Sequence, residues 1–419
     1  MSRARWSPGW TRRGLLAGML IGAALIPGYT TGSASRQCLG PRCGPAGTVR
    51  WRRPLSGSWI AAGGVVGTVP VSGQAFVAAG PQVAAIGYGL TVRGFDVRTG
   101  HPLWTAALAG FPAGASIVSV RSWDQVVTVG IGFPAAGAGG TARDEVVLAA
   151  PSGQRIRAYP AASYGGAVAA DARRTVVVGS TSVTGYDNRS GRPAWSRATG
   201  RLPQAWRTDG GYLYVTVAAG GYLGPAPVTA VRRISLATGG ERLIRPPGGS
   251  FAGSLSAAFD GVLLFSGPAG LSAYSEATGG RLWYRAGAVP ESEDPARPAL
   301  YVTRGGGMAG LNPRTGALIT RASIPGSSGV YGVRNGVALG LDQGAFGDAW
   351  GYNIGQRRVV WTTPSLPWPH YFVDLSGIGG SAAPGNGTIL LAACAGLGGP
   401  AAAGSGQVCL KPELVAINR

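Results

Sequence analysis

The residues that could do chemistry are few and lie far apart. The chain has only two histidines, His101 and His370, and no Gly-x-Ser-x-Gly sequence to present a nucleophilic serine. Serine catalysis therefore lacks support, because a positioned base must take the serine proton and only these two histidines could do so. Neither histidine stands at metal-ligand spacing from a cysteine, so a zinc site is not expected. The sequence therefore favours a non-catalytic protein.

The four cysteines are an even number, which suits disulfide bonds in an oxidising compartment. Four cysteines allow three connectivities, and among these we expect local pairing. The predicted bridges are Cys38–Cys43 and Cys394–Cys409. The second bridge would close a loop rich in glycine, alanine and proline, and a bridge across a loop of this size stabilises a fold by about 3 kcal/mol.

The only acidic cluster is Glu291-Ser292-Glu293-Asp294, which stands between prolines and predicts a solvated loop. Calcium would need about six to eight oxygen ligands at fixed geometry, which this short run does not supply. We therefore expect no metal site in the chain.

The composition indicates short strands and many turns. The chain has 73 glycines and 30 prolines, and both residues interrupt helices and mark turns. Hydrophobic residues make up 45% of the chain, which is enough to build a large core.

The chain is strongly basic. Its formal net charge is +20, from 37 basic and 17 acidic residues, and every basic residue except Lys411 is an arginine. Coding bias toward arginine, glycine and alanine explains much of this charge. The functional alternative is attraction to anionic polymers or lipid headgroups at a cell surface. No block rich in lysine or arginine occurs, so no nucleic-acid partner is expected.

Residues 1–37 predict an export signal with a short linker, and residues 38–419 predict one domain. Basic residues precede an apolar stretch at residues 15–26, and Gly32-Ser33-Ala34 offers small residues for cleavage. The sequence Thr11-Arg12-Arg13 resembles the core of a twin-arginine signal, which exports folded proteins.

The apolar stretch is shorter than the ~20 residues that span a bilayer, so membrane contact is expected only through an uncleaved signal. We expect an exported protein that is extracellular or at the outer face of the cytoplasmic membrane.

A pattern recurs after this segment: an apolar strand, an Asp-like residue, a Thr-Gly turn, and a short strand that ends in Trp. Glycine follows the Asp-like residue by four positions and Trp follows it by eight. The clear copies are Asp96, Gly100 and Trp104; Asp187, Gly191 and Trp195; and Ser275, Gly279 and Trp283. Weaker copies start at Ala149, Ser235, Asn312 and Asn353, and the last of these leads to Trp361. Copies 37 to 53 residues apart predict four short strands and variable loops per repeat, which is the blade of a β-propeller.

The turn chemistry explains these residue types. Asp, Asn or Ser can accept hydrogen bonds from backbone N–H groups two or three residues ahead and so close the turn. Glycine supplies the positive φ that such a turn requires. The Trp can bury ~150–250 Å² of surface between neighbouring blades. We interpret these residues as architecture.

Each end of the repeat region carries one half of the repeat, and the two halves complement each other. Residues 414–419 form a first half, with Asn418 at the Asp-like position, and residues 46–51 form a second half, with Gly47 and Trp51. Pairing of these N- and C-terminal strands would complete one composite blade and remove open edges. The predicted fold is all-β: an eight-bladed β-propeller of four-stranded antiparallel blades, closed by that pairing. Only if the weak Ala149 copy is spurious would seven blades remain. Residues 388–394 and 407–417 predict two antiparallel strands around the last loop.

These repeats resemble the PQQ-type repeat of eight-bladed quinoprotein propellers, over roughly residues 46–419. Dehydrogenases of that kind hold PQQ over a Trp and beneath a disulfide between adjacent cysteines, with calcium and an aspartate base. This sequence has no adjacent cysteines. Trp residues outside the repeat position could line a central pocket, although packing between blades is the favoured interpretation: Trp123, Trp206, Trp350 and Trp368. Acids that could face an axial channel are Asp124, Asp260, Asp342, Asp348 and Asp374.

The same repeat also occurs in envelope-assembly scaffolds that hold no cofactor. The resemblance therefore implies a non-catalytic, monomeric binding or scaffold module without a cofactor, whose partner is an envelope protein or an anionic cell-wall polymer. The alternative is a PQQ-dependent quinoprotein dehydrogenase that uses PQQ with calcium to oxidise an alcohol or a sugar. Proteins that take up a cofactor before export commonly use a twin-arginine signal, which keeps that alternative open, although the signal would equally serve a propeller that folds too quickly to be threaded through a membrane.

Overall fold

The computed structural model describes most of the chain. The described residues are 48–55, 59–61, 76–134, 141–161, 165–200, 205–218, 227–294, 299–304, 307–323, 330–341, 349–362, 375–376, 388–394, 397–400, 407–409 and 412–418. They belong to the second of two compact units, Ala34–Arg419, while the first is Met1–Ser33. The predicted export signal and the boundary at residue 38 lie outside the described residues and stay predictions.

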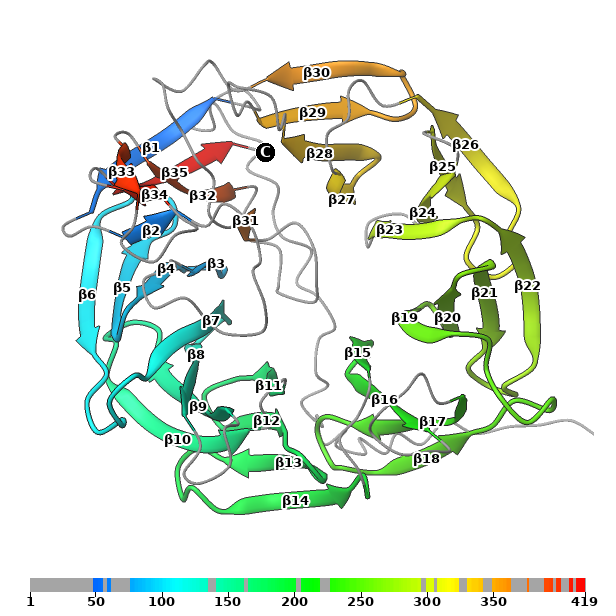
Figure 1. Ribbon diagram of the computed structural model, residues 1–419, viewed down its shortest axis with the longest axis horizontal. Coiled ribbons are helices and arrows are strands. Elements are labelled where there is room, and N and C mark those ends of the chain that lie inside the picture. The colour runs from blue at the N-terminus through cyan, green and yellow to red at the C-terminus, as the bar shows by residue number, and fades with distance from the viewer. Residues whose placement is uncertain are drawn as a thin grey trace, which may run out of the picture. The chain divides into compact units, whose positions relative to one another are not determined.

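Strands are the regular elements of the described part of the chain. Eight sheets each contain four antiparallel strands, which are the blades of the predicted propeller. Within this unit, Figure 1 shows the first strand of a blade toward the centre and the fourth strand at the outer edge. None of the described segments is a helix of the length and apolarity needed to cross a bilayer.

The blades are numbered here in chain order. Blade 1 is β3 (Phe76–Ala79), β4 (Val83–Tyr88), β5 (Thr91–Asp96) and β6 (Pro102–Ala107). Blade 2 is β7 (Ser116–Ser122), β8 (Val126–Pro134), β9 (Thr141–Ala149) and β10 (Arg155–Ala161). Blade 3 is β11 (Gly166–Ala170), β12 (Arg174–Val178), β13 (Ser182–Asp187) and β14 (Pro193–Ala198). Blade 4 is β15 (Trp206–Asp209), β16 (Tyr212–Ala218), β17 (Val228–Ser235) and β18 (Glu241–Ile244).

The later blades follow the same order. Blade 5 is β19 (Ser254–Phe259), β20 (Val262–Gly267), β21 (Gly270–Ser275) and β22 (Arg281–Ala286). Blade 6 is β23 (Val289–Asp294), β24 (Ala299–Arg304), β25 (Gly307–Leu311) and β26 (Leu318–Ala322). Blade 7 is β27 (Val330–Arg334), β28 (Val337–Leu341), β29 (Ala349–Asn353) and β30 (Arg358–Thr362). Blade 8 is β31 (Leu375–Ser376), β32 (Thr388–Cys394), β35 (Pro412–Asn418) and β1 (Val49–Pro54).

Blade 8 joins strands from the two ends of the repeat region. β1 pairs antiparallel with β35, with Trp51 opposite Ala416 and Arg53 opposite Leu414. The predicted composite blade is therefore confirmed. The weak Ala149 copy also forms a complete blade, because β9 ends at Ala149 and leads through a turn into β10. Eight blades, not seven, follow from these two sheets.

A ninth, smaller sheet corrects one prediction. β2 (Trp59–Ala61), β34 (Gln407–Cys409) and β33 (Leu397–Pro400) form three antiparallel strands outside the blades. The strand predicted over residues 407–417 is thus two strands in different sheets, β34 and β35. Apolar residues occur in both strands, and the pairing partners decide the split: β34 pairs with β2 and β33, whereas β35 pairs with β32 and β1.

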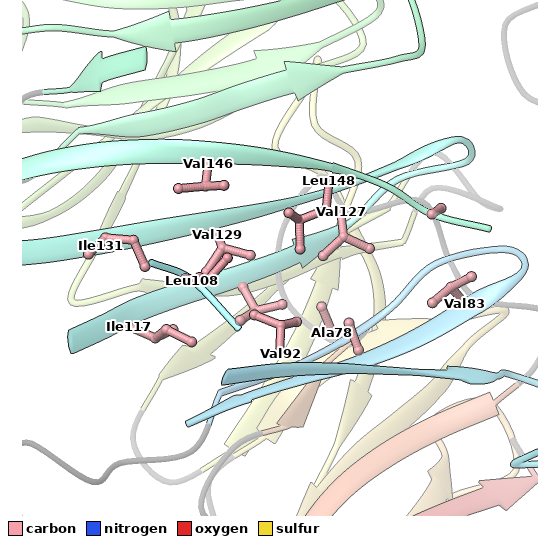
Figure 2. Close-up of a cluster of buried hydrophobic side chains, with 13 residues drawn as sticks. Ala78, Val83, Val92, Leu108, Ile117, Val127, Val129, Ile131, Val146 and Leu148 are labelled. Carbon is pink, nitrogen blue, oxygen red and sulfur yellow. The ribbon is translucent and has the colours of Figure 1, made fainter. Parts of the chain in front are cut away.

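The core is divided among the contacts between neighbouring blades. Side chains alternate between the two faces of a strand, so each blade packs against the blade on either side. In β9, Val146 and Leu148 belong to the cluster shared with blade 1, whereas Val147 packs with Val177 of blade 3. Figure 2 shows the first of these clusters, where apolar side chains from blades 1 and 2 interdigitate. Each fully buried side chain of this type contributes about 1.5–3 kcal/mol relative to an exposed one.

Tight hairpins connect the first and second strands of several blades. Asp260-Gly261 and Asn335-Gly336 each form a two-residue loop with positive φ at both positions, 51° and 77° in the first and 52° and 75° in the second. Two positive φ values define the type I′ turn, whose twist matches that of antiparallel strands. Both dipeptides are turn signals that the repeat pattern does not include.

Candidate functional site

The repeat turn of blade 1 is closed by its aspartate. Oδ1 of Asp96 accepts hydrogen bonds from Arg98 N at 3.0 Å, Thr99 N at 2.8 Å and Thr99 Oγ1 at 2.8 Å. Partial burial alone would raise the pKa of the Asp96 carboxyl, but these hydrogen bonds outweigh burial and lower it. Gly100 has a φ of +66°, and a Cβ there would lie 2.5 Å from the Trp51 ring of blade 8. Glycine at this position satisfies two requirements: the positive φ of the turn and the close approach of the Trp51 ring.

The other repeat turns use the same bonds with different residues. Asp187 accepts from Ser190 N at 2.7 Å, and Gly191 has a φ of +72°. In the copy that begins at Ser275, Thr278 N donates to Ser275 Oγ at 3.3 Å. In blade 7, Asn353 Oδ1 accepts from Gln356 N at 2.9 Å, and Arg357 takes the positive-φ position where the other copies have glycine.

Four of the repeat tryptophans lie between blades, each over a turn of the next blade: Trp51, Trp104, Trp195 and Trp283. Trp51 Nε1 donates to Val97 O at 3.0 Å, Trp104 Nε1 to Ala150 O at 2.6 Å, and Trp283 Nε1 to Pro313 O at 2.8 Å. Trp195 is buried between blades 3 and 4, and its indole N–H has no hydrogen-bond partner among the described residues. The Trp361 ring lies against Gly351 of its own blade. These side chains hold blades together.

Arginines two positions after the repeat Trp form a second set of contacts between blades. Arg53 Nε donates to Gly100 O at 2.6 Å, Arg197 Nε to Gly239 O at 2.6 Å, and Arg285 Nη2 to Gly316 O at 2.7 Å. In each case the acceptor is the turn glycine of the next blade. Part of the high arginine content is therefore structural, and the signal for it was the recurring Trp-x-Arg sequence.

Several predicted residues lie wholly or partly outside the described part of the chain. Gly47, Cys38, Cys43, Trp368, Asp342, Asp348 and Asp374 lie outside the described residues. Asn418 pairs with Thr388 at the end of β35, Cys394 ends β32 and Cys409 ends β34, but their side chains are not described. Both predicted disulfides stay predictions.

The predicted acidic loop is a strand, so that prediction is wrong. Glu291 to Asp294 lie in β23, which pairs with β24 inside blade 6. Asp294 is fully buried and accepts hydrogen bonds from Asn335 N at 3.0 Å and Gly336 N at 2.7 Å of blade 7. The carboxylate thus supports the type I′ turn of the neighbouring blade, a long-range contact that overrides the local loop signal of the flanking prolines.

The PQQ candidates that lie among the described residues have other partners. No group of three or more His, Cys, Asp or Glu side chains comes together as metal ligands within them. Trp206 and Trp350 pack in the contacts between blades, and Trp123 Nε1 donates to Thr128 Oγ1 at 3.1 Å. Asp260 forms a bidentate ion pair with Arg314, in which both N–O distances are 3.1 Å.

A buried charged cluster lies where blade 2 faces blade 3. Arg143 Nη2 lies 3.3 Å from Oε2 of Glu145 and donates to Ser119 Oγ at 2.6 Å. Arg121 donates to the carbonyl of Ala167 in blade 3. Glu145 is fully buried, and its Oε1 has no hydrogen-bond partner in the described part of the chain. Burial lowers the pKa of Arg121; Glu145 opposes this effect and Arg143 adds to it.

Glycine makes space for this cluster. A Cβ on Gly130 would lie 2.2 Å from Nη2 of Arg143. The cluster is not among the residues predicted from the sequence, although the run Arg143-Asp144-Glu145 inside an otherwise apolar strand is a signal for it. The atoms without hydrogen-bond partners among the described residues, Arg143 Nε and Glu145 Oε1, are closed off from solvent, and Arg121 links the cluster to blade 3.

The largest exposed apolar side chains concentrate on the fourth strands of blades 5, 6 and 7. We call this set the outer-strand surface: Leu282, Tyr284, Leu318, Ile319, Val359 and Val360. Exposed fractions run from 39% for Val360 to 56% for Ile319. Among the described residues, the other fourth strands carry one large apolar side chain of this exposure, Leu103 of β6 at 44%.

The charge on these three strands is entirely positive. β22, β26 and β30 contain Arg281, Arg285, Arg321 and Arg358 and no acidic residue. Arg285 is committed to the turn of blade 6, whereas Arg281 and Arg321 are exposed and form no ion pair with the described acids. Exposed apolar side chains beside unpaired cations are typical of a surface that binds another molecule.

One family model matches the chain. It describes the outer membrane protein assembly factor BamB and matches residues 179–334, from blade 3 into blade 7. The predicted resemblance to PQQ-type repeats is confirmed over these residues. No curated protein sequence matches the chain.

Several solved structures are similar in fold. BamB from Moraxella catarrhalis is 18% identical, with 74% of this chain and 92% of that chain covered and a TM-score of 0.43. The dihydro-heme d1 dehydrogenase NirN in complex with DHE is 15% identical, with 69% and 66% covered and a TM-score of 0.49. Hsv2 from Kluyveromyces lactis is 7% identical, with 74% and 100% covered and a TM-score of 0.45. At these values the similarities carry no functional argument.

Proposed function

We propose that this chain is an exported, non-catalytic β-propeller that acts as a binding or scaffold module at the cell envelope. The observation that carries the proposal is the outer-strand surface, where three successive blades expose apolar side chains next to arginines. The repeat residues are committed to turns and to contacts between blades, which leaves a rigid frame that presents this surface.

Two further observations support the scaffold role and the location at the cell envelope. The matching family model describes an envelope assembly factor, and the match spans β22 and β26 of the outer-strand surface. The basic and apolar segments at residues 1–34 support export, by the twin-arginine route or a related one. The proposed partner is an envelope protein or an anionic cell-wall polymer, and no cofactor is proposed.

Retention on isolated envelopes tests the binding role. The exported protein, purified from the culture, is mixed with envelopes at low and at high salt, and the bound fraction is measured by sedimentation. We expect retention that weakens as salt rises, because exposed ionic contacts are screened. The double variant Arg281→Gln, Arg321→Gln should bind less than the wild type.

A matched control removes the same charge elsewhere. Arg173 and Arg189 are exposed on blade 3, so Arg173→Gln, Arg189→Gln lowers the net charge equally. This control should keep its retention if the outer-strand surface is the contact. Equal loss in both variants would reduce the binding to a general effect of net charge, and no retention of the wild type would defeat the proposed function.

Equilibrium dialysis with PQQ and calcium tests the absence of a cofactor. We expect no retention of PQQ by the exported protein. Stoichiometric, calcium-dependent retention would overturn the non-catalytic role and favour a dehydrogenase.

A further inference from the structure

The fourth strand of blade 5 is an unprotected sheet edge. β22 spans six residues and pairs only with β21 in the sheet order, so its other edge is free of strand partners among the described residues. A free edge presents N–H and C=O groups that can pair with another chain. Five of the six residues of β22 are exposed.

Other blades protect the same edge with proline or with a short strand. Proline lacks an N–H and blocks pairing, and it occurs on the fourth strands β6, β10, β14 and β1 as Pro102, Pro160, Pro193 and Pro54. β18 has only four residues. β22, β26 and β30 contain no proline. The unprotected edges therefore coincide with the outer-strand surface.

The register shows which amides of β22 point outward. Gly287 N donates to Ala269 O at 3.1 Å, and Tyr284 lies opposite Ser272 in the ladder. Bonded and non-bonded pairs alternate in an antiparallel ladder, so Arg285 N faces β21 while Tyr284 N faces away from it. The Tyr284 amide is thus available to an added strand.

The side chains of β22 define what an added strand would carry. Leu282 and Tyr284 are 45% and 44% exposed, and they alternate with Arg281 and Arg285. Apolar side chains opposite Leu282 and Tyr284, and acidic ones near Arg281, would form favourable cross-strand pairs. A second copy of this chain is a poor occupant, because its formal net charge is +20.

We propose that the outer edge of β22 binds an extended segment of a partner protein in which acidic residues alternate with apolar ones, so that the segment adds a fifth strand to blade 5. This inference rests on the proposed binding function and specifies its surface and its kind of partner. Backbone hydrogen bonds would supply affinity, and the alternating side chains would supply selectivity.

The probe is a labelled synthetic peptide of alternating valine and glutamate, and a valine–lysine peptide serves as the charge control. Fluorescence anisotropy measures binding to the full exported protein. The wild type should bind the glutamate peptide and bind the lysine peptide about tenfold more weakly. Tyr284→Pro removes the outward amide and should weaken binding of the glutamate peptide by about tenfold or more.

A matched proline variant controls for the substitution itself. Thr199 N donates to Thr181 O at 2.7 Å, so Ser196 of β14 occupies the same register as Tyr284, one residue after the repeat Trp. Ser196→Pro should leave peptide binding unchanged, since β14 already carries Pro193. Equal binding by wild type and Tyr284→Pro would overturn the proposal.

Charge reversal keeps the proposal testable if Tyr284→Pro does not fold. Arg281→Glu changes an exposed side chain and should reverse the preference between the two peptides, with a change of about fivefold to tenfold for each. An unchanged preference would contradict the proposed pairing.

Envelope retention separates this proposal from the proposed function. If the wild type is retained and Tyr284→Pro is retained equally, the edge proposal fails while the binding function stands. If sedimentation velocity shows self-association of the wild type that Tyr284→Pro abolishes, the occupant is a second copy and the proposal is wrong.

Discussion

The two faces of blade 2 are held to their neighbours by different chemistry. Toward blade 1, Val146 and Leu148 enter an apolar cluster (Figure 2). Trp104 of blade 1 packs over the turn glycine Gly153. Toward blade 3, the same strand presents Arg143 and Glu145. The blade 2 position that corresponds to Trp104 is Arg157, which lies over Gly191 and donates to Arg189 O at 3.2 Å. One blade geometry thus accepts either an apolar or a charged contact.

The two contacts should respond differently to substitution of their side chains. Loss of an apolar side chain costs its transfer free energy and that of the cavity it leaves. A buried ion pair has already lost its hydration, so removal of one partner leaves an uncompensated charge. The contact between blades 2 and 3 should therefore tolerate removal of the whole cluster better than removal of one member.

The largest effect is expected from Glu145→Ala. Arg143 and Arg121 would remain mostly buried without their carboxylate, which should cost about 3–5 kcal/mol in the free energy of unfolding. Urea denaturation followed by fluorescence measures it. The triple variant Arg121→Leu, Arg143→Met, Glu145→Leu should recover most of the loss, and a triple variant less stable than Glu145→Ala would contradict this account.

Leu148→Ala tests the opposite face. Leu148 is fully buried in the cluster with blade 1, so its truncation should cost about 2–5 kcal/mol in the free energy of unfolding. The same denaturation experiment applies. A loss below about 1 kcal/mol would show that this contact relaxes around the cavity and is not tightly packed.

Trp104 and Arg157 lie over turn glycines, and their substitution should change the free energy of unfolding by a smaller amount. Trp104→Phe removes the hydrogen bond to Ala150 O and some buried area, which should cost about 1–2 kcal/mol. Arg157→Met removes an exposed contact and should cost less than about 0.5 kcal/mol. Thermal unfolding of the two variants, each compared with the wild type, ranks them, and the reverse order would refute the assignment of Trp104 as the stronger wedge.

The smallest expected effect is a dependence of stability on pH, which comes from Asp187 in the turn beneath Arg157. Hydrogen bonds from Ser190 lower the pKa of Asp187, so its stabilising contribution is present above the unfolded pKa of about 3.9 and is lost as pH falls through the folded value. Asp187→Asn should therefore be less stable than the wild type near neutral pH, and the gap should close below about pH 4. Denaturation midpoints measured across this range test it; a gap independent of pH would place the effect elsewhere. The turn of blade 2 has Ala149 at this position and serves as the contrast.

The repeat predicted the blades because its signals are local. Asp96, Gly100 and their equivalents act within one turn, so their spacing survives in the sequence. The composite blade could be predicted for the same reason, since each end carries half of the pattern. Strand β23 and the split between β34 and β35 could not, because partners from other strands decide them.

The site was harder to predict than the fold. Exposure of Leu282 and Ile319 depends on their place at a sheet edge, and apolar residues in a strand otherwise predict burial. The charged cluster depends on which face of β9 meets blade 3, a matter of register across two blades. The prolines on other fourth strands were visible, but their meaning depends on knowing which strand is the edge.

Because β1 pairs with β35, blade 8 cannot form until β35 has been synthesised. Trp51 pairs with Ala416, 365 residues later in the chain (416 − 51). While a ribosome makes blades 1 to 7, β1 has no strand beside it, and the face of blade 1 that receives Trp51 stays incomplete. The edge of β1 therefore stays unpaired during most of synthesis. Misassembly at this edge is most probable in that interval, and pairing with β35 ends it.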